Sequence, residues 1–274
     1  MISEPMEMAK WIEDEVLPLS TSEFKMSGCP IGHCIPPKFE SYCKIYHPFE
    51  VTPDEPDILE PDKDYRKPVS ITFLRDPEKV TKITMTKNDG TVIDLFEEHK
   101  ERLKDYHSKK WIFTAWKTIA DKYGLLFHNE INTETYVNKF QEIGWPKNLA
   151  FPGEGQLPRK NLMDLLGVLE KECTAGEVFI YQKIPHSIYK DNRYDDLVRC
   201  SYEEVLGYFD KDFAGYLYSA DKSWIVFTDT DQHFTIVGGD KRLIRSLATC
   251  DLEVLECTKD TRVDEHSDRI NRKR

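Results

Sequence analysis

Three cysteines and a histidine near the N-terminus have the residue types of a zinc site. Cys29 and Cys34 are separated by four residues, and Cys43 and His47 would lie one turn apart on a helix. Structural zinc sites use four such ligands, commonly as two close pairs. On spacing alone, the four residues could therefore supply a complete ligand set.

The same stretch also has the spacing of an amphipathic helix, with apolar residues at i, i+3, i+4 and i+7 in Phe39, Tyr42, Cys43 and Tyr46. Pro36 and Pro37 suit the first turn of a helix, and Pro48 ends it because proline cannot continue the backbone hydrogen bonds. In this interpretation Cys43 is a small buried hydrophobe. We therefore expect this segment to have a structural role, with Phe39 and Tyr42 buried. We expect it to bind neither a metal nor another cofactor.

Two aspartates after an apolar run form a second candidate site. An apolar strand followed by D-x-D, here Asp229 and Asp231, resembles the nucleophile motif of haloacid-dehalogenase-type phosphatases. The resemblance implies that Asp229 attacks phosphorus and that Asp231 acts as acid and base. That fold needs a parallel βα array after the motif, whereas one predicted helix and one predicted strand follow Asp231. The alternative is a polar turn between two strands, since aspartate readily forms Asx-turns.

Three further residues could bind a ligand. Gly238 and Gly239 precede a predicted helix and could expose backbone N–H groups to an anion. They could equally form a tight turn from strand to helix, with Asp240 as the helix N-cap. Trp145 lies in a predicted turn, and it is the tryptophan that we expect to be partly exposed to a ligand or partner.

Apolar periodicity and turn residues predict an α+β fold of helices and antiparallel hairpins, without a βαβ array. Ser108 could cap a helix that Gly124 ends, and the other helices are predicted near residues 8–16, 136–143, 162–173, 201–209 and 240–249. Hairpins are predicted at residues 82–96 and 223–239, with further strands at 177–182 and 252–257.

Composition shifts along the chain predict its organisation. Residues 1–257 are expected to form a single α+β domain, which could divide into two lobes joined near residues 98–108. Residues 50–68 are acidic and rich in proline, which predicts a long surface loop. Residues 258–274 are polar throughout, which predicts a flexible tail.

The overall charge narrows the classes of partner. The chain has 49 acidic and 38 basic residues and a formal net charge of −11. This balance disfavours nucleic acid, whose phosphates attract Lys and Arg, and it suits a basic protein partner. No segment approaches the roughly 20 apolar residues of a membrane helix, so we expect no membrane insertion. The seven scattered cysteines indicate reduced thiols and a cytoplasmic location, and the oligomeric state stays open.

Two blocks of sequence resemble a widespread family of uncharacterised bacterial proteins. The segment IPPKFESYCKIYHPF is similar to an LPPGFEAYARILHP-type segment, and SWIVFTDTDQHFTIVGGDKRLIRSL is similar to a W-x-V-x-T-x-x-D-x-x-x-T-x-V-G-G segment. The resemblance covers roughly residues 28–48, 111–173 and 222–256, and it implies no established activity. In such relatives His33, Cys34 and Cys43 are not expected at the matching positions, which argues further against zinc.

The segment IPPKFESY also resembles the start of a helix in the SUKH superfamily, many of whose members are cytoplasmic immunity proteins that block toxins. This resemblance implies a non-catalytic, immunity-like protein-binding module with a basic partner, which is the function we expect. The alternative is a small hydrolase or phosphatase-like enzyme that uses Asp229 and Asp231.

Overall fold

The computed structural model describes residues 1–18, 28–60, 70–72, 84–86, 92–94, 108–155, 157–172, 176–182, 196–209, 215–229 and 231–272. The chain divides into two compact units. The first comprises Met1–Phe49, Thr114–Val137 and Phe151–Arg274, and the second comprises Glu50–Phe113 and Asn138–Ala150. The junction predicted near residues 98–108 lies outside the described residues, apart from Ser108.

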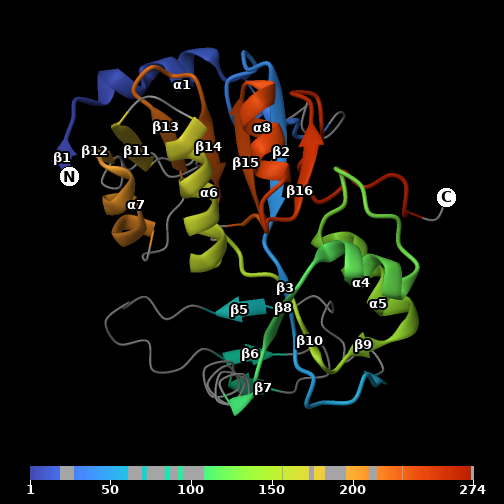
Figure 1. Cartoon of the computed structure of the whole chain (residues 1–274). Helices are drawn as coiled ribbons and strands as arrows, with labels where there is room; N and C mark the ends of the chain where they lie inside the picture. The colour runs from blue at the N-terminus through green and yellow to red at the C-terminus, as the bar shows by residue number, and fades with distance from the viewer. Residues whose placement is uncertain are drawn as a thin grey trace. The chain divides into compact units, whose positions relative to one another are not determined.

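An eight-stranded sheet forms the centre of the first unit, in the order β1-β12-β11-β13-β14-β15-β2-β16 (Figure 1). All its neighbouring strands are antiparallel, which confirms the predicted α+β class. In sheet order the strands are Ile2–Ser3, Asp196–Cys200, Val178–Gln182, Gly215–Ser219, Ile225–Thr228, Phe234–Gly239, Ser41–Tyr46 and Val254–Cys257. The hairpin predicted at residues 223–239 is β14 paired with β15.

Side chains are buried on both faces of this sheet. Helices α6 (Arg159–Glu172), α7 (Tyr202–Phe209) and α8 (Lys241–Ala248) lie over one face (Figure 1) and share an aliphatic core with it. The opposite face is aromatic, and the segment of η1 (Met6–Ala9) and α1 (Lys10–Glu15) covers part of it. There the ring of Trp11 meets that of Tyr218 edge-on at 5.4 Å. Neither face of the central strands is therefore exposed to solvent.

The helix predicted over Phe39–Tyr46 is wrong, because Ser41–Tyr46 form β2, between β15 and β16. All six residues of β2 are buried, so apolar side chains occupy both faces and happen to match a helical spacing. Cys43 and Ile45 face the helices, while Tyr42, Lys44 and Tyr46 face the other way. Tyr42 is 3% exposed, as predicted, whereas Phe39 is only half-buried.

The helix predicted between Ser108 and Gly124 begins later than expected. Residues Ile112–Thr114 form β8, and α4 spans Trp116–Tyr123. The carboxylate of Glu253 accepts the backbone N–H groups of Trp116 and Lys117, at 2.6 and 2.8 Å, and so fixes the first turn. Gly124 ends the helix with φ of 68°, as predicted.

The segment predicted as a flexible tail, residues 258–274, contains buried side chains in the part that the structure describes, residues 258–272. Ser267 and Asp268 are 0% and 2% exposed. Asn132 donates to the hydroxyl of Ser267 at 2.8 Å, and Thr135 donates to the carboxylate of Asp268 at 2.7 Å. These polar side chains can be buried because they form hydrogen bonds with polar groups near the start of α5 (Thr133–Ile143).

Within the described residues, the second unit contains three small sheets. Its strands are β3 (Phe49–Val51) with β10 (Leu149–Ala150) and β8, β4 (Leu59–Glu60) with β9 (Trp145–Pro146), and β5 (Ser70–Thr72) with β6 (Thr84–Thr86) and β7 (Val92–Asp94). The β6–β7 pair confirms the strands of the hairpin predicted at residues 82–96. The surface loop predicted at 50–68 contains part of β3 and all of β4, and residues 61–68 lie outside the described residues.

Within the described ranges, none of the helices combines the length and the apolar character that crossing a bilayer requires.

Candidate functional site

Asp229 and Asp231 lie on the turn between β14 and β15. The backbone N–H of Asp231 donates to the Asp229 carboxylate at 3.1 Å, and Gln232 N–H donates to the Asp229 carbonyl at the same distance. These bonds form the Asx-turn that was the alternative to a phosphatase motif. Asp231 is exposed and Asp229 half-buried. The turn accounts for both residue types, and the hydrolase stays a prediction without support from this geometry.

Gly238 and Gly239 do not form an anion-binding loop, because both lie within β15. Gly238 pairs with Tyr42 and Ile225, and Gly239 pairs with Ser41. A Cβ atom on Gly238 would lie 2.7 Å from Cδ2 of Phe39, and one on Gly239 would lie 2.7 Å from Cδ2 of Leu243. The glycines are thus required for close packing on the two faces of the sheet. Asp240 caps α8 as predicted, accepting from Leu243 N–H at 2.7 Å.

Trp145 lies in β9 of the second unit and is half-buried. Its ring contacts that of Phe140 with the centroids 5.7 Å apart. Partial exposure was predicted, but the contact with Phe140 gives the indole a packing role. No ligand is needed to explain its position.

The four residues of the possible zinc set are separated into three environments. Cys43 is on the helix-covered face of β2. His47 is buried, with Nδ1 2.9 Å from the Gly153 carbonyl oxygen and Nε2 3.0 Å from the Thr235 hydroxyl. Burial lowers the pKa of His47 to about 4, so this imidazole is a neutral structural group. Among the described residues, no three His, Cys, Asp or Glu side chains gather as a metal site.

Cys29 and Cys34 flank the short turn η2 (Ile31–His33), and the Cys29 thiol donates to the carbonyl of Pro30 at 3.9 Å. Cys34 is 6% exposed and Cys29 is half-buried. The nearby Cys34 thiol is the main cause that lowers the pKa of Cys29. The nearby Cys29 thiol, together with burial, raises the pKa of Cys34 well above its ordinary value. The two thiols are therefore chemically unequal.

Lys44 lies on the aromatic face of β2, and the sequence pattern did not predict its burial. Its side chain is 0% exposed, and Nζ has no hydrogen-bond partner. Nζ lies 4.3 Å from the ring centre of Phe234 and 5.8 Å from that of Tyr46. Burial lowers the pKa of Lys44 to about 8, and the charge of Lys44 in turn favours ionisation of Cys34. Lys44 is not among the apolar residues whose spacing predicted a helix, and its place in β2 accounts for its burial.

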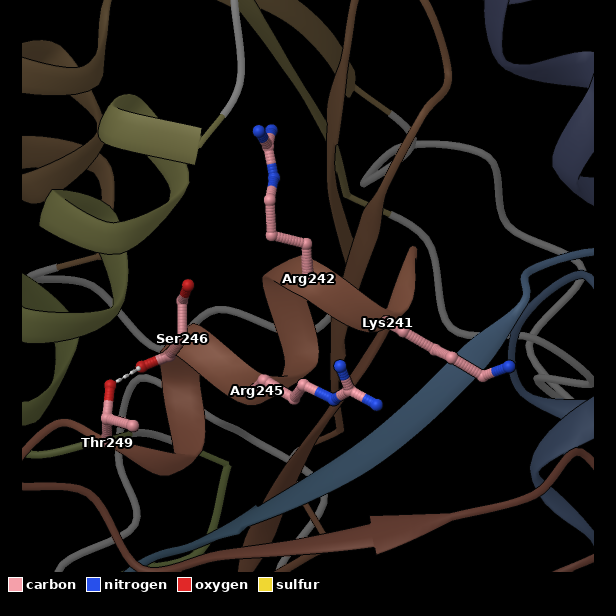
Figure 2. Close-up of a pocket in the computed structure, with 5 residues that line it drawn as sticks. All are labelled: Lys241, Arg242, Arg245, Ser246 and Thr249. Carbon is pink, nitrogen blue, oxygen red and sulfur yellow. Dashed lines mark hydrogen bonds between the residues drawn. The ribbon is translucent and has the colours of Figure 1, made fainter.

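A hollow on the surface of α8 is lined by Lys241, Arg242, Arg245, Ser246 and Thr249 (Figure 2). Lys241 pairs with Glu40 at 3.1 Å, and Arg242 pairs with Glu172 at 3.0 Å. Figure 2 shows the Arg242 guanidinium pointing away from Lys241 and Arg245. Lys241 and Arg242 already have carboxylate partners, and Arg242 points away from the other two cations, so we assign no anion to this hollow.

Acidic and apolar side chains share one exposed segment of the second unit, residues 53–59. Asp54 and Asp57 are exposed, and Ile58 and Leu59 are 52% and 40% exposed. The backbone of the segment is held by the β4–β9 pairing and by a hydrogen bond from Lys147 N–H to the Ile58 carbonyl at 3.0 Å. A fixed backbone therefore presents these four side chains to solvent.

The comparisons with known proteins add no relative: no family model, no curated protein and no solved structure matches this chain.

Proposed function

We propose that the protein is a non-catalytic binding module of the cytoplasm that takes a basic protein as its partner. The observation that supports it is the exposed segment 53–59, which combines carboxylates with large apolar side chains. We refer to Asp54, Asp57, Ile58 and Leu59 as the acidic–apolar segment.

The composition of the acidic–apolar segment suits a protein interface. Protein interfaces place apolar side chains at their centre and polar or charged ones at their rim. Ile58 and Leu59 would supply the apolar contact. Asp54 and Asp57 would select a partner with Lys or Arg at the matching positions. Exposed apolar side chains in one short segment are otherwise unfavourable in water, which is the reason for expecting a partner.

The net charge of −11 supports the same choice of partner, because a negative protein attracts a basic one over a distance and speeds their encounter. The six cysteines that the structure describes are free thiols, in keeping with a reducing compartment. An immunity-like role is one form of this function, in which the acidic–apolar segment would cover a basic surface of a toxin.

Charge reversal in the acidic–apolar segment tests the proposal. The wild-type protein, an Asp54→Lys/Asp57→Lys variant and an Asp14→Lys/Glu170→Lys control would be immobilised and incubated with extract of the source cells at low and high salt. The control makes the same change in net charge at exposed positions of α1 and α6. We expect wild type and control to retain a basic protein at low salt and the segment variant to lose it.

Binding of the retained protein, once purified, should also weaken on Ile58→Ser/Leu59→Ser substitution by about tenfold or more, since two apolar contacts would be lost. The proposal fails if the three immobilised proteins retain the same set of proteins, or if none of them enriches a basic protein.

A further inference from the structure

Two large apolar side chains are exposed close together on the first unit. Leu126 and Ile270 are each 58% exposed. Asn271, which directly follows Ile270, accepts from the Leu126 N–H at 2.8 Å and donates to the Leu126 carbonyl at 2.9 Å. The Asn271 side chain also donates to the buried carboxylate of Asp268 at 2.8 Å. These bonds fix the backbone beside both apolar side chains, which together form one apolar area on the surface.

Cations border this apolar area. Arg269 directly precedes Ile270, Arg272 follows two residues later, and both are exposed. Arg272 donates to the Glu265 carbonyl at 3.3 Å, while the Glu265 carboxylate lies 3.3 Å from His266. Within the described ranges neither guanidinium has a carboxylate partner, in contrast to the paired cations of α8. We refer to four residues as the basic–apolar patch: Leu126, Arg269, Ile270 and Arg272.

The basic–apolar patch has the composition that the proposed function assigns to a partner of the acidic–apolar segment. Each surface combines two exposed apolar side chains with two exposed charges, and the charges of the two surfaces are opposite in sign. Opposite charges around a shared apolar contact are the features by which one protein surface selects another. The chain therefore carries both halves of a contact that two of its molecules could form.

We propose that the acidic–apolar segment of a second copy of this chain occupies the basic–apolar patch. The inference rests on the proposed function, because it uses the same segment, and it adds a form of regulation. A segment that is covered by a second copy is closed to any other basic partner, so self-association and partner binding compete.

The contact joins two different surfaces, so it is heterologous, and each pair of molecules keeps one patch and one segment for further copies unless a ring closes. The net charge of −11 makes two copies repel each other at a distance, and only the local charges attract. A small contact under this repulsion should be weak, and association should therefore depend strongly on concentration.

Sedimentation of the purified chain tests the contact with no other protein present. The wild type should shift from monomer to larger species as its concentration rises to about 100 μM, since a small interface gives weak binding. Asp54→Lys/Asp57→Lys and Arg269→Glu/Arg272→Glu should each weaken this association by about tenfold or more, because like charges then meet. A mixture of the two variants should associate again, because the new lysines of one meet the new glutamates of the other.

The matched control for the patch variant is Lys10→Glu/Lys171→Glu, which makes the same change in net charge at exposed positions of α1 and α6. It should associate like the wild type. Leu126→Ser/Ile270→Ser leaves the charge unchanged and should weaken association by about tenfold or more. Circular dichroism would check folding, and Arg269→Gln/Arg272→Gln would replace the charge reversal if that variant is unfolded.

The inference is overturned if the wild type stays monomeric at every concentration, if the mixture of folded variants does not associate, or if the control loses association. Retention of an acidic protein from extract by a monomeric wild type, but not by the patch variant, would assign the patch to another protein and would equally exclude the second copy. Retention of a basic protein from extract, which tests the proposed function, depends on none of these results, so the two proposals can fail separately.

Discussion

The ammonium nitrogen of Lys44 lies 4.3 Å from the centre of the Phe234 ring, inside the sheet-centred core of the first unit. The ring face offers a weak attraction to the cation, but it does not replace the water that the cation has lost. The buried charge of Lys44 therefore lowers the free energy of unfolding at neutral pH.

Lys44→Met should stabilise the protein at pH 7. Burial lowers the pKa of Lys44 in the folded state to about 8, below the ordinary value near 10.4 of an unfolded chain. The penalty is complete below pH 8 and disappears as pH rises towards 10.4, because the unfolded chain then binds more protons. We expect a gain of about 1–3 kcal/mol at pH 7 that shrinks by pH 9.5, measured by urea unfolding.

Lys171→Met on the exposed side of α6 is the control for that substitution and should change stability by less than about 0.5 kcal/mol. A folded Lys44→Met variant that is less stable than the wild type at pH 7 would contradict this account of Lys44.

The position of Lys44 also shows where the sequence was misleading. Tyr42, Cys43 and Tyr46 match a helical period, but they do so because β2 is buried on both faces and apolar side chains stand at most positions. The period of a strand cannot be seen when neither face is polar. The β14–β15 hairpin was predictable because a polar turn separates its two apolar arms.

Polar contacts between residues far apart in the sequence could not be predicted, because no local pattern identifies the partner. Nothing near Trp116 in the sequence identifies Glu253 as the acceptor at the start of α4, and nothing near Asp268 identifies Thr135. The spacing of Cys29 and Cys34 was visible, whereas the separation of Cys43 and His47 from them depended on the strand. The pair of cysteines was thus visible in the sequence, and the burial of Lys44 was not.

Gly238→Ala should destabilise the protein by about 1–3 kcal/mol, because the new methyl group would overlap Phe39 and press on Ile35. Gly167→Ala is the matched control: it lies in α6 with nothing within 4 Å of the added Cβ, and it should stabilise by up to about 1 kcal/mol. Thermal or urea unfolding measures both. Phe39→Leu should recover part of the loss in Gly238→Ala; equal effects of the two glycine substitutions would refute the close approach.

Asp268→Asn should remove a pH-dependent part of the stability. Burial by itself would raise the pKa of Asp268, but hydrogen bonds from His128, Asn271 and Thr135 outweigh it and hold this pKa well below its ordinary value. A carboxylate of this kind stabilises the fold above its unfolded pKa, near 3.9, and the stabilisation is lost as pH falls through the folded pKa.

We therefore expect Asp268→Asn to cost about 2 kcal/mol at pH 7 and progressively less as the pH falls below 3.9. Exposed Asp231 gives the control, since Asp231→Asn should change stability by less than about 0.5 kcal/mol. A constant difference between wild type and Asp268→Asn from pH 7 to pH 2 would show that the charge of Asp268 is unimportant.

Glu253→Ala should cost about 1–2 kcal/mol, because it leaves the N–H groups of Trp116 and Lys117 without their acceptor. Glu253→Gln keeps one acceptor oxygen and should cost less. Amide hydrogen exchange at the first turn of α4 would locate the effect, with the α8 amides as an internal reference. Equal loss of protection in both helices would mean that Glu253 stabilises the unit as a whole and not this helix start.

The place of β2 in the sheet also has a consequence for how the chain folds. Ser41 contacts Glu256 across the β2–β16 pair, 215 residues away in the chain, and β15 flanks β2 on its other side. On a ribosome, β2 emerges long before β15 and β16, the two strands that pair with it. Such high contact order predicts slow folding. The aromatic side chains of β2, which are buried in the folded protein, would be exposed during that delay, and such exposed apolar surface favours aggregation.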